Sequence, residues 1–169
     1  LLQTKLYIPP TRTNLVARPE LLKKLDAVLT SKLALISAPA GFGKTTLISA
    51  WIDYAQSGNP GDLFTWITLD QNDNDAGRFF TYFAAALNQA KPSIADPLLK
   101  LLSSGARPAN EALLVTLINI LAAMPSDVIL VLDDYQSIEE PDIHQGMIFL
   151  LDHLPPQLHL ILVTRVDPP

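Results

Sequence analysis

The chain of 169 residues contains no cysteine, and this absence excludes disulfide bonds, cysteine-ligated zinc and catalysis by a thiol. Long apolar runs are missing as well. Residues 112–124 are the longest stretch of helical character without a charged side chain, and they fall short of the roughly 20 residues that a membrane-spanning helix needs. No basic segment leading into an apolar run marks a secretory signal peptide. These absences predict a cytoplasmic protein without a membrane partner.

Charged residues, and basic ones in particular, are scarce. They make up 17% of the chain, against roughly 25% in a typical soluble domain. The 12 lysines and arginines do not balance the 17 aspartates and glutamates, and the only basic cluster is Lys23-Lys24. Because nucleic-acid-binding proteins usually present a basic face, we expect no direct nucleic-acid binding by this chain. The 49% of hydrophobic residues instead predicts a folded domain with a sizeable core.

Apolar segments of two kinds alternate along the chain. Short, continuous apolar runs predict strands buried on both faces, at residues 33–37, 64–69, 128–132 and 160–163. Apolar residues at helical spacing predict helices at residues 19–29, 44–56, 79–87, 113–121 and 142–153. Between the third and fourth helices we expect a loop-rich stretch, which contains Pro92, Pro97 and Pro108. Strands that alternate with helices predict an α/β fold, a three-layer parallel sheet, in a single domain.

A glycine-rich segment joins the first predicted strand to the second predicted helix. It reads Ala38-Pro39-Ala40-Gly41-Phe42-Gly43-Lys44-Thr45-Thr46. This matches the phosphate-binding (Walker A) loop, with Ala38 in place of the usual first glycine. Gly41 and Gly43 let backbone N–H groups turn towards phosphate oxygens, at a helix start that favours anions. The alternative, a glycine turn with a solvated lysine, is disfavoured by the strand-to-helix context.

The chemistry of this loop predicts a site for ATP or ADP with Mg²⁺. Lys44 would supply a charge for the β- and γ-phosphates, and Thr45 a hydroxyl for Mg²⁺. The residues of the loop that we expect to contact the nucleotide are Ala40, Gly41, Phe42, Gly43, Lys44, Thr45 and Thr46.

Two carboxylates follow the third predicted strand. A buried strand that ends in an acidic residue places it at the carboxyl edge of the sheet, where ligands of such folds bind. Asp133 would hold Mg²⁺, directly or through water, and Asp134 would orient or deprotonate the attacking water. The alternative is an acidic turn that merely follows a strand. It is disfavoured because a phosphate-binding loop precedes these carboxylates in the chain.

The fourth predicted strand is followed by Thr164-Arg165. An arginine at that position can reach a γ-phosphate and report whether it is present. A surface arginine after an edge strand is the alternative. We therefore interpret Lys44, Asp134 and Arg165 as the candidate catalytic residues, and Thr45 and Asp133 as the candidate metal ligands.

The acidic segment at residues 70–75 resembles a calcium-binding loop. However, Asp75 occupies the position that needs glycine, and Thr81 the position that needs glutamate. We expect a capped turn in front of the helix that contains Phe79.

Several motifs together resemble one family. The chain opens with Thr4-Lys5-Leu6-Tyr7-Ile8-Pro9-Pro10, continues with Leu15-Val16-Ala17-Arg18-Pro19-Glu20-Leu21-Leu22, and later has Trp66-Ile67-Thr68-Leu69-Asp70 with Arg78-Phe79 and Leu132-Asp133-Asp134-Tyr135. With the phosphate-binding loop and Thr164-Arg165, they occur in the order found in the N-terminal NTPase domain of the MalT-like regulators. These are large, ATP-binding transcriptional regulators of the LuxR type, in the STAND class of P-loop NTPases.

The resemblance implies more than the residues do. It implies an ASCE/STAND-type NTPase domain over residues 1–169, in which 1–31 form an extension and helix that flank the nucleotide and 32–169 form the sheet core. Val16 and Arg18 would flank the adenine, and Arg165 would sense the γ-phosphate. Proteins of this family are inactive with ADP, become multimers with ATP and an inducer, and are reset by hydrolysis. Their DNA-binding and inducer-binding domains have no counterpart in this sequence, which implies a piece of a longer regulator.

The family also implies a strand order. The strand at residues 160–163 would lie between the first and third strands, and a fifth strand would follow in the longer protein. The chain would then stop before the last strand of the sheet and leave an exposed edge beside the first strand, where association is a hazard.

We therefore predict an ATP/ADP-binding switch domain with slow, Mg²⁺-dependent hydrolysis that controls self-association of a transcriptional regulator. A small-molecule P-loop kinase is one alternative, although such kinases need a lid with several arginines and the arginines here are scattered. They are Arg12, Arg18, Arg78, Arg107 and Arg165. A module that holds nucleotide for oligomerisation, without turnover, is the other alternative.

Overall fold

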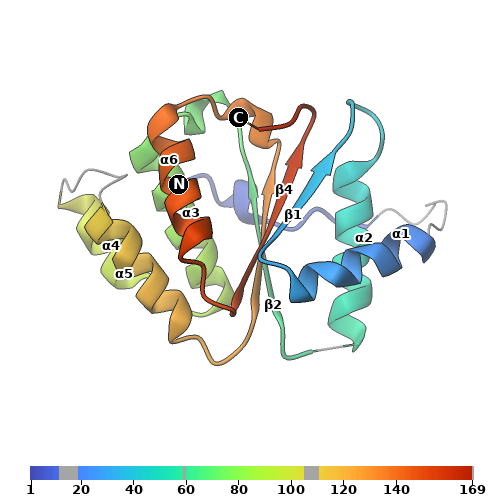
Figure 1. Ribbon diagram of the computed structural model, residues 1–169, viewed down its shortest axis with the longest axis horizontal. Helices are drawn as coiled ribbons and strands as arrows, with labels where there is room; N and C mark the ends of the chain where they lie inside the picture. The colour runs from blue at the N-terminus through green and yellow to red at the C-terminus, as the bar shows by residue number, and fades with distance from the viewer. Residues whose placement is uncertain (12–18, 59, 105–110, 169) are drawn as a thin grey trace.

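The strands form one parallel sheet in the computed structural model, which describes residues 1–11, 19–58, 60–104 and 111–168 (Figure 1). The strands are β1 (Leu33–Ser37), β2 (Leu63–Thr68), β3 (Val128–Asp133) and β4 (Leu158–Thr164). They are hydrogen-bonded in the order β1-β4-β3-β2, and each pair is parallel. This order confirms the predicted parallel α/β fold and the place of β4 between β1 and β3.

Helices cover both faces of the sheet. On one side lie α1 (Pro19–Leu25) and α2 (Lys44–Gly58), and on the other α3 (Ala76–Ala90), α4 (Asp96–Ser103), α5 (Glu111–Ala122) and α6 (Pro141–Asp152) (Figure 1). Four short 3₁₀ turns complete the described structure: η1 (Gln3–Leu6), η2 (Asp26–Thr30), η3 (Gln71–Asp73) and η4 (Tyr135–Ser137). The three predicted layers are confirmed.

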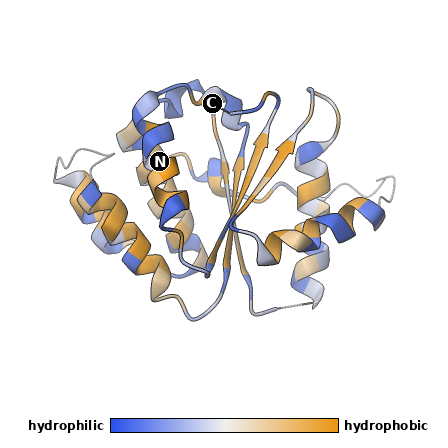
Figure 2. Ribbon diagram, in the orientation of Figure 1, coloured by the Kyte–Doolittle hydropathy of each residue, from blue (hydrophilic) through white to orange (hydrophobic). Residues whose placement is uncertain are grey.

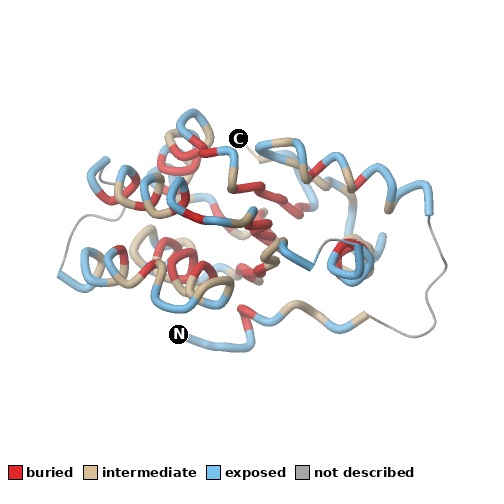
Figure 3. Tube along the Cα trace, turned by 90° about the horizontal axis from the view of Figure 1, so that it is seen from below, coloured by how far each residue is buried: buried red, intermediate tan, exposed pale blue. Residues whose placement is uncertain are grey.

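The two inner strands lie wholly inside the molecule. Every residue of β3 and β4 is buried, and the apolar strands stand out in the middle layer (Figures 2 and 3). Leu130 and Leu132 point into the core beneath α3–α6, whereas Ile129 and Val131 belong to the core beneath α2. Burial on both faces explains why these runs are continuously apolar rather than alternating.

The edge strand β1 departs from its predicted burial. Leu33 is 38% exposed and Leu35 is 45% exposed, although both were expected inside the sheet. They pair in register with Leu160 and Leu162, which belong to the core beneath α3–α6. On that face β1 lies at the rim of the sheet, and within the described residues β4 is its only neighbouring strand. The continuous apolar run of β1 therefore leaves an open apolar surface.

A helix occupies part of the stretch predicted to be loop-rich. Residues Asp96–Ser103 form α4, and Pro97 lies in its first turn. Proline is favoured there because its missing N–H is not needed and its φ angle suits a helix. Leu98 is fully buried against the core, so the helix is anchored by its apolar side. Pro97 therefore marks the start of a helix rather than a loop.

The contact between α6 and α3 depends on a glycine. A Cβ atom at Gly146 would lie 2.8 Å from Cζ of the fully buried Phe80 ring. We expect Gly146→Ala to lower the free energy of unfolding by about 1–3 kcal/mol, because an overpacked core shifts its neighbours. Urea unfolding measures this change. Gly58→Ala is the matched control, since its Cβ meets no atom within 4 Å. Equal stability of the two variants would show that Phe80 accommodates the methyl group.

Candidate functional site

The predicted site residues follow the carboxyl ends of three strands. The glycine loop at residues 38–43 follows β1, Asp133 ends β3, and Arg165 follows β4. Because the strands are parallel, these three ends meet at one edge of the sheet (Figure 1). The backbone N–H of Ala38 donates to the carbonyl oxygen of Thr164 at 3.3 Å, which ties the start of the loop to the end of β4.

The loop has a backbone that requires its two glycines. Gly41 has φ +83° and Gly43 has φ +76°, both in the left-handed region that disfavours a side chain. A Cβ at either position would meet no atom within 4 Å, so the requirement is conformational rather than steric. Phe42, between them, is 64% exposed, and Ala40 is exposed as well. The loop therefore presents its backbone to solvent in front of α2.

Lys44 is the first residue of α2, and its ammonium group folds back over the loop. Its Nζ donates to the carbonyl oxygens of Ala38 and Pro39, the latter at 3.1 Å. A cation held over a loop at a helix N-terminus makes this edge of the sheet attractive to an anion. The next residues, Thr45 and Thr46, are half-buried in the first turn of α2.

Thr45 and Asp133 are brought together from α2 and β3. The Thr45 hydroxyl donates to Oδ2 of Asp133 at 3.0 Å, and the backbone N–H of Asp134 donates to the other carboxylate oxygen at 3.0 Å. Burial raises the pKa of Asp133, the hydrogen bond from Thr45 opposes this, and the charge of Asp134 adds to it. Within the described residues, no three His, Asp or Glu side chains gather around a common point. One carboxylate with one hydroxyl suits Mg²⁺, which usually keeps several waters.

Asp134 and Arg165 meet through a third residue, Gln136. The Gln136 side-chain amide donates from Nε2 to Oδ1 of Asp134 at 2.7 Å, and its Oε1 accepts from the backbone N–H of Arg165 at 3.0 Å. An Arg165 guanidinium nitrogen lies 3.5 Å from the same Asp134 oxygen. The side chains of Arg165 and Asp134 are 53% and 37% exposed, so this ion pair contributes little by itself.

Asp134 has an uncommon backbone conformation. Its φ of 57° and ψ of 39° lie in the left-handed region, which aspartate enters more readily than most residues because its short carboxylate bonds locally. The chain turns there from β3 into η4. This turn places the Asp134 and Gln136 side chains together at the end of the sheet.

Two hollows flank these residues. A polar cleft of about 610 Å³ runs from Arg165 and Asp134 to the turn after β2, where Asp70, Gln71 and Asn74 line it. An apolar groove of about 420 Å³ lies between α1, β1 and α2, and among the residues that line it are Leu21, Leu25, Val28, Leu35 and Leu47. Leu47 lies in the first turn of α2, so the groove begins beside the loop.

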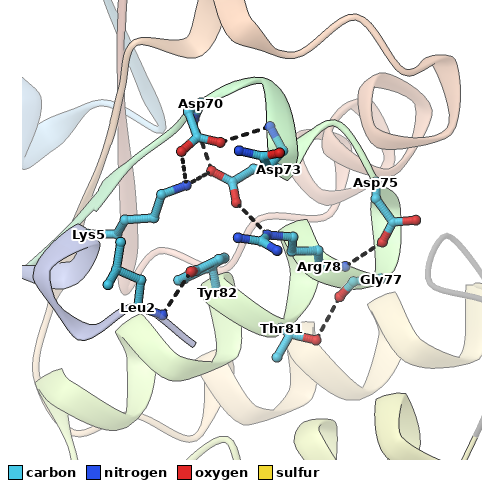
Figure 4. Close-up of polar contacts among 10 residues, drawn as sticks. Leu2, Lys5, Asp70, Asp73, Asp75, Gly77, Arg78, Thr81 and Tyr82 are labelled. Carbon is cyan, nitrogen blue, oxygen red and sulfur yellow. Dashed lines mark hydrogen bonds and ion pairs between the residues drawn. The ribbon is translucent and has the colours of Figure 1, made fainter.

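The acidic turn after β2 binds the N-terminal segment through the Lys5 ammonium group. The Lys5 ammonium lies 2.8 Å from an Asp70 oxygen and also bonds Asp73, which is fully buried (Figure 4). The Arg78 guanidinium bonds the other oxygen of Asp73 at 3.0 Å. Asp70 and Asp73 form a reciprocal capping box around η3, and Asp75 caps α3. The predicted capped turn is confirmed.

The electrostatics of this cluster agree with its geometry. Burial lowers the pKa of Lys5, but the hydrogen bonds and charges of Asp70 and Asp73 outweigh it, so the pKa is raised overall. The hydrogen bond from Lys5 is the main cause of the lowered pKa of Asp70. The Lys5 side chain thus fixes η1 against the loop that lines the polar cleft.

Two of the predicted contacts lie outside the described residues, namely Val16 and Arg18. The others converge: Lys44, Thr45 and Asp133 in one group, and Asp134 with Arg165 in a second group beside it. Sequence reasoning missed Gln136 and Lys5. Gln136 belongs to no motif, and Lys5 lies in an N-terminal motif that assigns it no role, so only their places in the fold reveal their partners.

A parallel sheet between helical layers, with a glycine loop that runs from its first strand into a helix, defines a P-loop NTPase-like domain. The chain belongs to the family described as Nephrocystin 3, N-terminal, whose model matches residues 10–165.

Relatives of known description agree with the predicted family. The chain is 38% identical over 165 residues to the HTH-type transcriptional regulator MalT of Cronobacter sakazakii, covering 98% of this chain and 18% of that protein. It is 37% identical over 169 residues to MalT of Yersinia enterocolitica, again covering 18% of the relative. The chain is thus homologous to the N-terminal region of MalT regulators and spans about a fifth of their length.

A solved structure of C. elegans PCH-2 is similar over 88% of this chain and 37% of that chain, at a TM-score of 0.42 and 10% identity, a level that carries no argument. None of the helices built from described residues is long and apolar enough to cross a bilayer.

Proposed function

We propose that this chain is an ATP/ADP-binding switch domain of a transcriptional regulator, with slow Mg²⁺-dependent ATP hydrolysis. The observation that carries the proposal is the loop with Gly41 and Gly43 in left-handed conformations, followed by Lys44 at the start of α2 and facing the Thr45–Asp133 pair. Backbone N–H groups in such a loop cradle phosphate oxygens, and the helix start adds a favourable potential.

Each residue of the site has a role in this proposal. Lys44 exchanges the loop carbonyls for the β- and γ-phosphate oxygens, because charged acceptors bind an ammonium more strongly. Thr45 and Asp133 would hold Mg²⁺, directly or through water, and the ion would supply positive charge beside the phosphates. Asp134 orients or deprotonates the attacking water. Arg165, which is half exposed beside it, senses the γ-phosphate.

The apolar groove offers a place for the adenine. It begins at Leu47 beside the loop, and α1 forms part of its wall. Val16 and Arg18 precede α1 in the chain, which supports their proposed position flanking the base. We propose that residues 1–31 belong with the sheet core in one nucleotide-binding unit, and the bonds of Lys5 to the turn after β2 support this.

The regulatory part of the proposal rests on the relatives. The relatives are HTH-type transcriptional regulators, and the matched region is 18% of their length. We propose that DNA contact and inducer sensing belong to other domains of such a protein, and that the ATP state self-associates in the cytoplasm. The net charge of -5 of this chain agrees with DNA contact elsewhere.

One feature favours a second function, a small-molecule P-loop kinase. The polar cleft beyond Asp134 is large enough for an acceptor molecule beside a γ-phosphate. Incubation with ATP labelled on the γ-phosphate separates the two functions. Release of free phosphate supports the ATPase, and label on an added small-molecule acceptor supports the kinase. Retention of intact nucleotide over hours would instead favour a module that holds nucleotide without turnover.

The metal role of Thr45 is testable by binding. We expect Thr45→Val to reduce the gain in ATP affinity that Mg²⁺ provides by about tenfold, since one ligand to the ion is lost. ATP affinity measured in EDTA should stay within about twofold. Calorimetric titrations with and without Mg²⁺ give both values.

Thr116→Val is the matched control for this substitution. The Thr116 hydroxyl donates to the carbonyl oxygen of Ala112 in α5, on the opposite side of the sheet from α2. It should leave the Mg²⁺ dependence unchanged. A wild-type Mg²⁺ dependence in Thr45→Val would remove Thr45 from the metal site.

A further inference from the structure

We infer that Gln136 is a positioning residue, which holds Asp134 in place for water activation while Arg165 moves towards the γ-phosphate. This inference rests on the proposed function and assigns a role to a residue that no motif marks. Its basis is one side chain that bonds both candidate residues at once.

The Gln136 amide uses a donor and an acceptor in opposite directions. Nε2 donates to the carboxylate of Asp134 at 2.7 Å, which is short and charge-assisted. Oε1 accepts from the backbone N–H of Arg165 at 3.0 Å, at the point where the chain leaves β4. The side chain therefore links η4, which follows β3, to the end of the neighbouring strand.

Asp134 needs such a partner. Its backbone is in the left-handed region, and its carboxylate is 37% exposed, so neither the main chain nor packing fixes the side chain firmly. The guanidinium of Arg165 at 3.5 Å is a weak second contact. When that guanidinium leaves for a phosphate, the bond from Gln136 is the contact that continues to orient the carboxylate.

The bond to Arg165 has the complementary effect. Gln136 bonds the backbone N–H of Arg165 and does not hold the guanidinium group. The main chain of Arg165 therefore stays anchored to η4 while its side chain, which is 53% exposed, changes partner. The Arg165 side chain can thus move while Gln136 keeps the Asp134 carboxylate in position.

Among glutamine, glutamate and leucine, only the glutamine amide can both donate to Asp134 and accept from Arg165. Glutamate at this position keeps the acceptor for Arg165 but loses the donor, and adds a negative charge beside Asp134. Leucine loses both bonds at similar size. The two substitutions therefore distinguish a role in orienting Asp134 from a merely structural link to β4.

The experiment compares steady-state ATP hydrolysis by the unaltered chain, Gln136→Leu and Gln136→Glu, with ADP affinity measured by calorimetry. We expect kcat to fall about tenfold in both variants, the loss typical of one hydrogen bond to a charged group. KM for ATP and the ADP affinity should stay within about twofold, because the loop and Lys44 are intact. An unchanged ADP affinity also shows that the variants fold.

Gln89→Leu is the matched control. Gln89 is exposed in the last turn of α3 and does not line the polar cleft, so its kcat should be unchanged. A wild-type kcat in Gln136→Glu would overturn the positioning role and leave only a structural link. ADP binding by the unaltered chain without any hydrolysis would also overturn it. Absence of ADP binding would instead refute the proposed nucleotide site itself.

Discussion

Replacement of Lys44 by alanine is expected to weaken ATP binding about 100-fold and ADP binding about tenfold. An ammonium that bonds phosphate oxygens makes charge-assisted hydrogen bonds, each worth about 1.5–3 kcal/mol. In the structure the same ammonium already lies over the loop, bonded to two carbonyl oxygens. ATP loses more than ADP because Lys44 bonds oxygens of both the β- and the γ-phosphate, and ADP has no γ-phosphate. Calorimetric titration of the variant with each nucleotide measures both losses.

Lys100→Ala provides the control for this substitution. Lys100 is an exposed lysine in α4, on the opposite side of the sheet from α2 (Figure 1). Its removal changes the net charge of the chain by the same amount, and nucleotide affinity should stay unchanged. Unaltered ATP and ADP affinity in Lys44→Ala would refute the assignment of residues 38–46 as the phosphate site.

The second large effect concerns stability. We expect Asp73→Ala to lower the free energy of unfolding by about 3–5 kcal/mol, the cost of removing one partner from a buried ion pair. Asp73 is fully buried and bonds both Lys5 and Arg78 (Figure 4). Without it, the buried Lys5 ammonium keeps the Asp70 carboxylate, whose side chain is 48% exposed, as its ion-pair partner. Urea unfolding followed by circular dichroism measures the change.

Two comparisons make this test specific. Asp75→Ala in the same turn removes only the cap of α3 and should cost about 1 kcal/mol. Lys5→Met combined with Asp73→Ala should recover part of the loss, because no buried lysine is then left without its carboxylate. If Asp73→Ala costs no more than Asp75→Ala, the bond between the N-terminal segment and the turn after β2 does not stabilise the chain.

Much of the fold was predictable because a short, continuous apolar run indicates a strand that is buried on both faces. The runs at 128–132 and 160–163 are apolar throughout, as strands covered on both faces must be, and they are the inner strands β3 and β4. The run at 33–37 is equally apolar, yet β1 is an edge strand with one open face. Local sequence does not reveal how many neighbours a strand has, so the run itself did not predict that Leu33 and Leu35 are exposed. Only the family resemblance implied an open edge beside this strand.

The candidate site was predictable to the extent that its residues follow strand ends. Parallel strands bring residues 38–46, Asp133 and Arg165 to one edge, whatever the details of packing. Contacts made by single side chains do not follow from this rule. Lys5 and Asp73 are 68 residues apart, and Gln136 and Arg165 are 29 apart, with no pattern that connects them. The position of such pairs depends on the whole tertiary structure.

The central proposal is that this edge of the sheet binds ATP and ADP, and a calorimetric titration of the unaltered chain with ADP and Mg²⁺ decides it. We predict a saturable isotherm with one nucleotide per chain, and an ADP affinity about tenfold lower in Lys44→Ala. A titration without binding heat, from a folded chain at several temperatures, would refute the nucleotide site and with it the proposed switch.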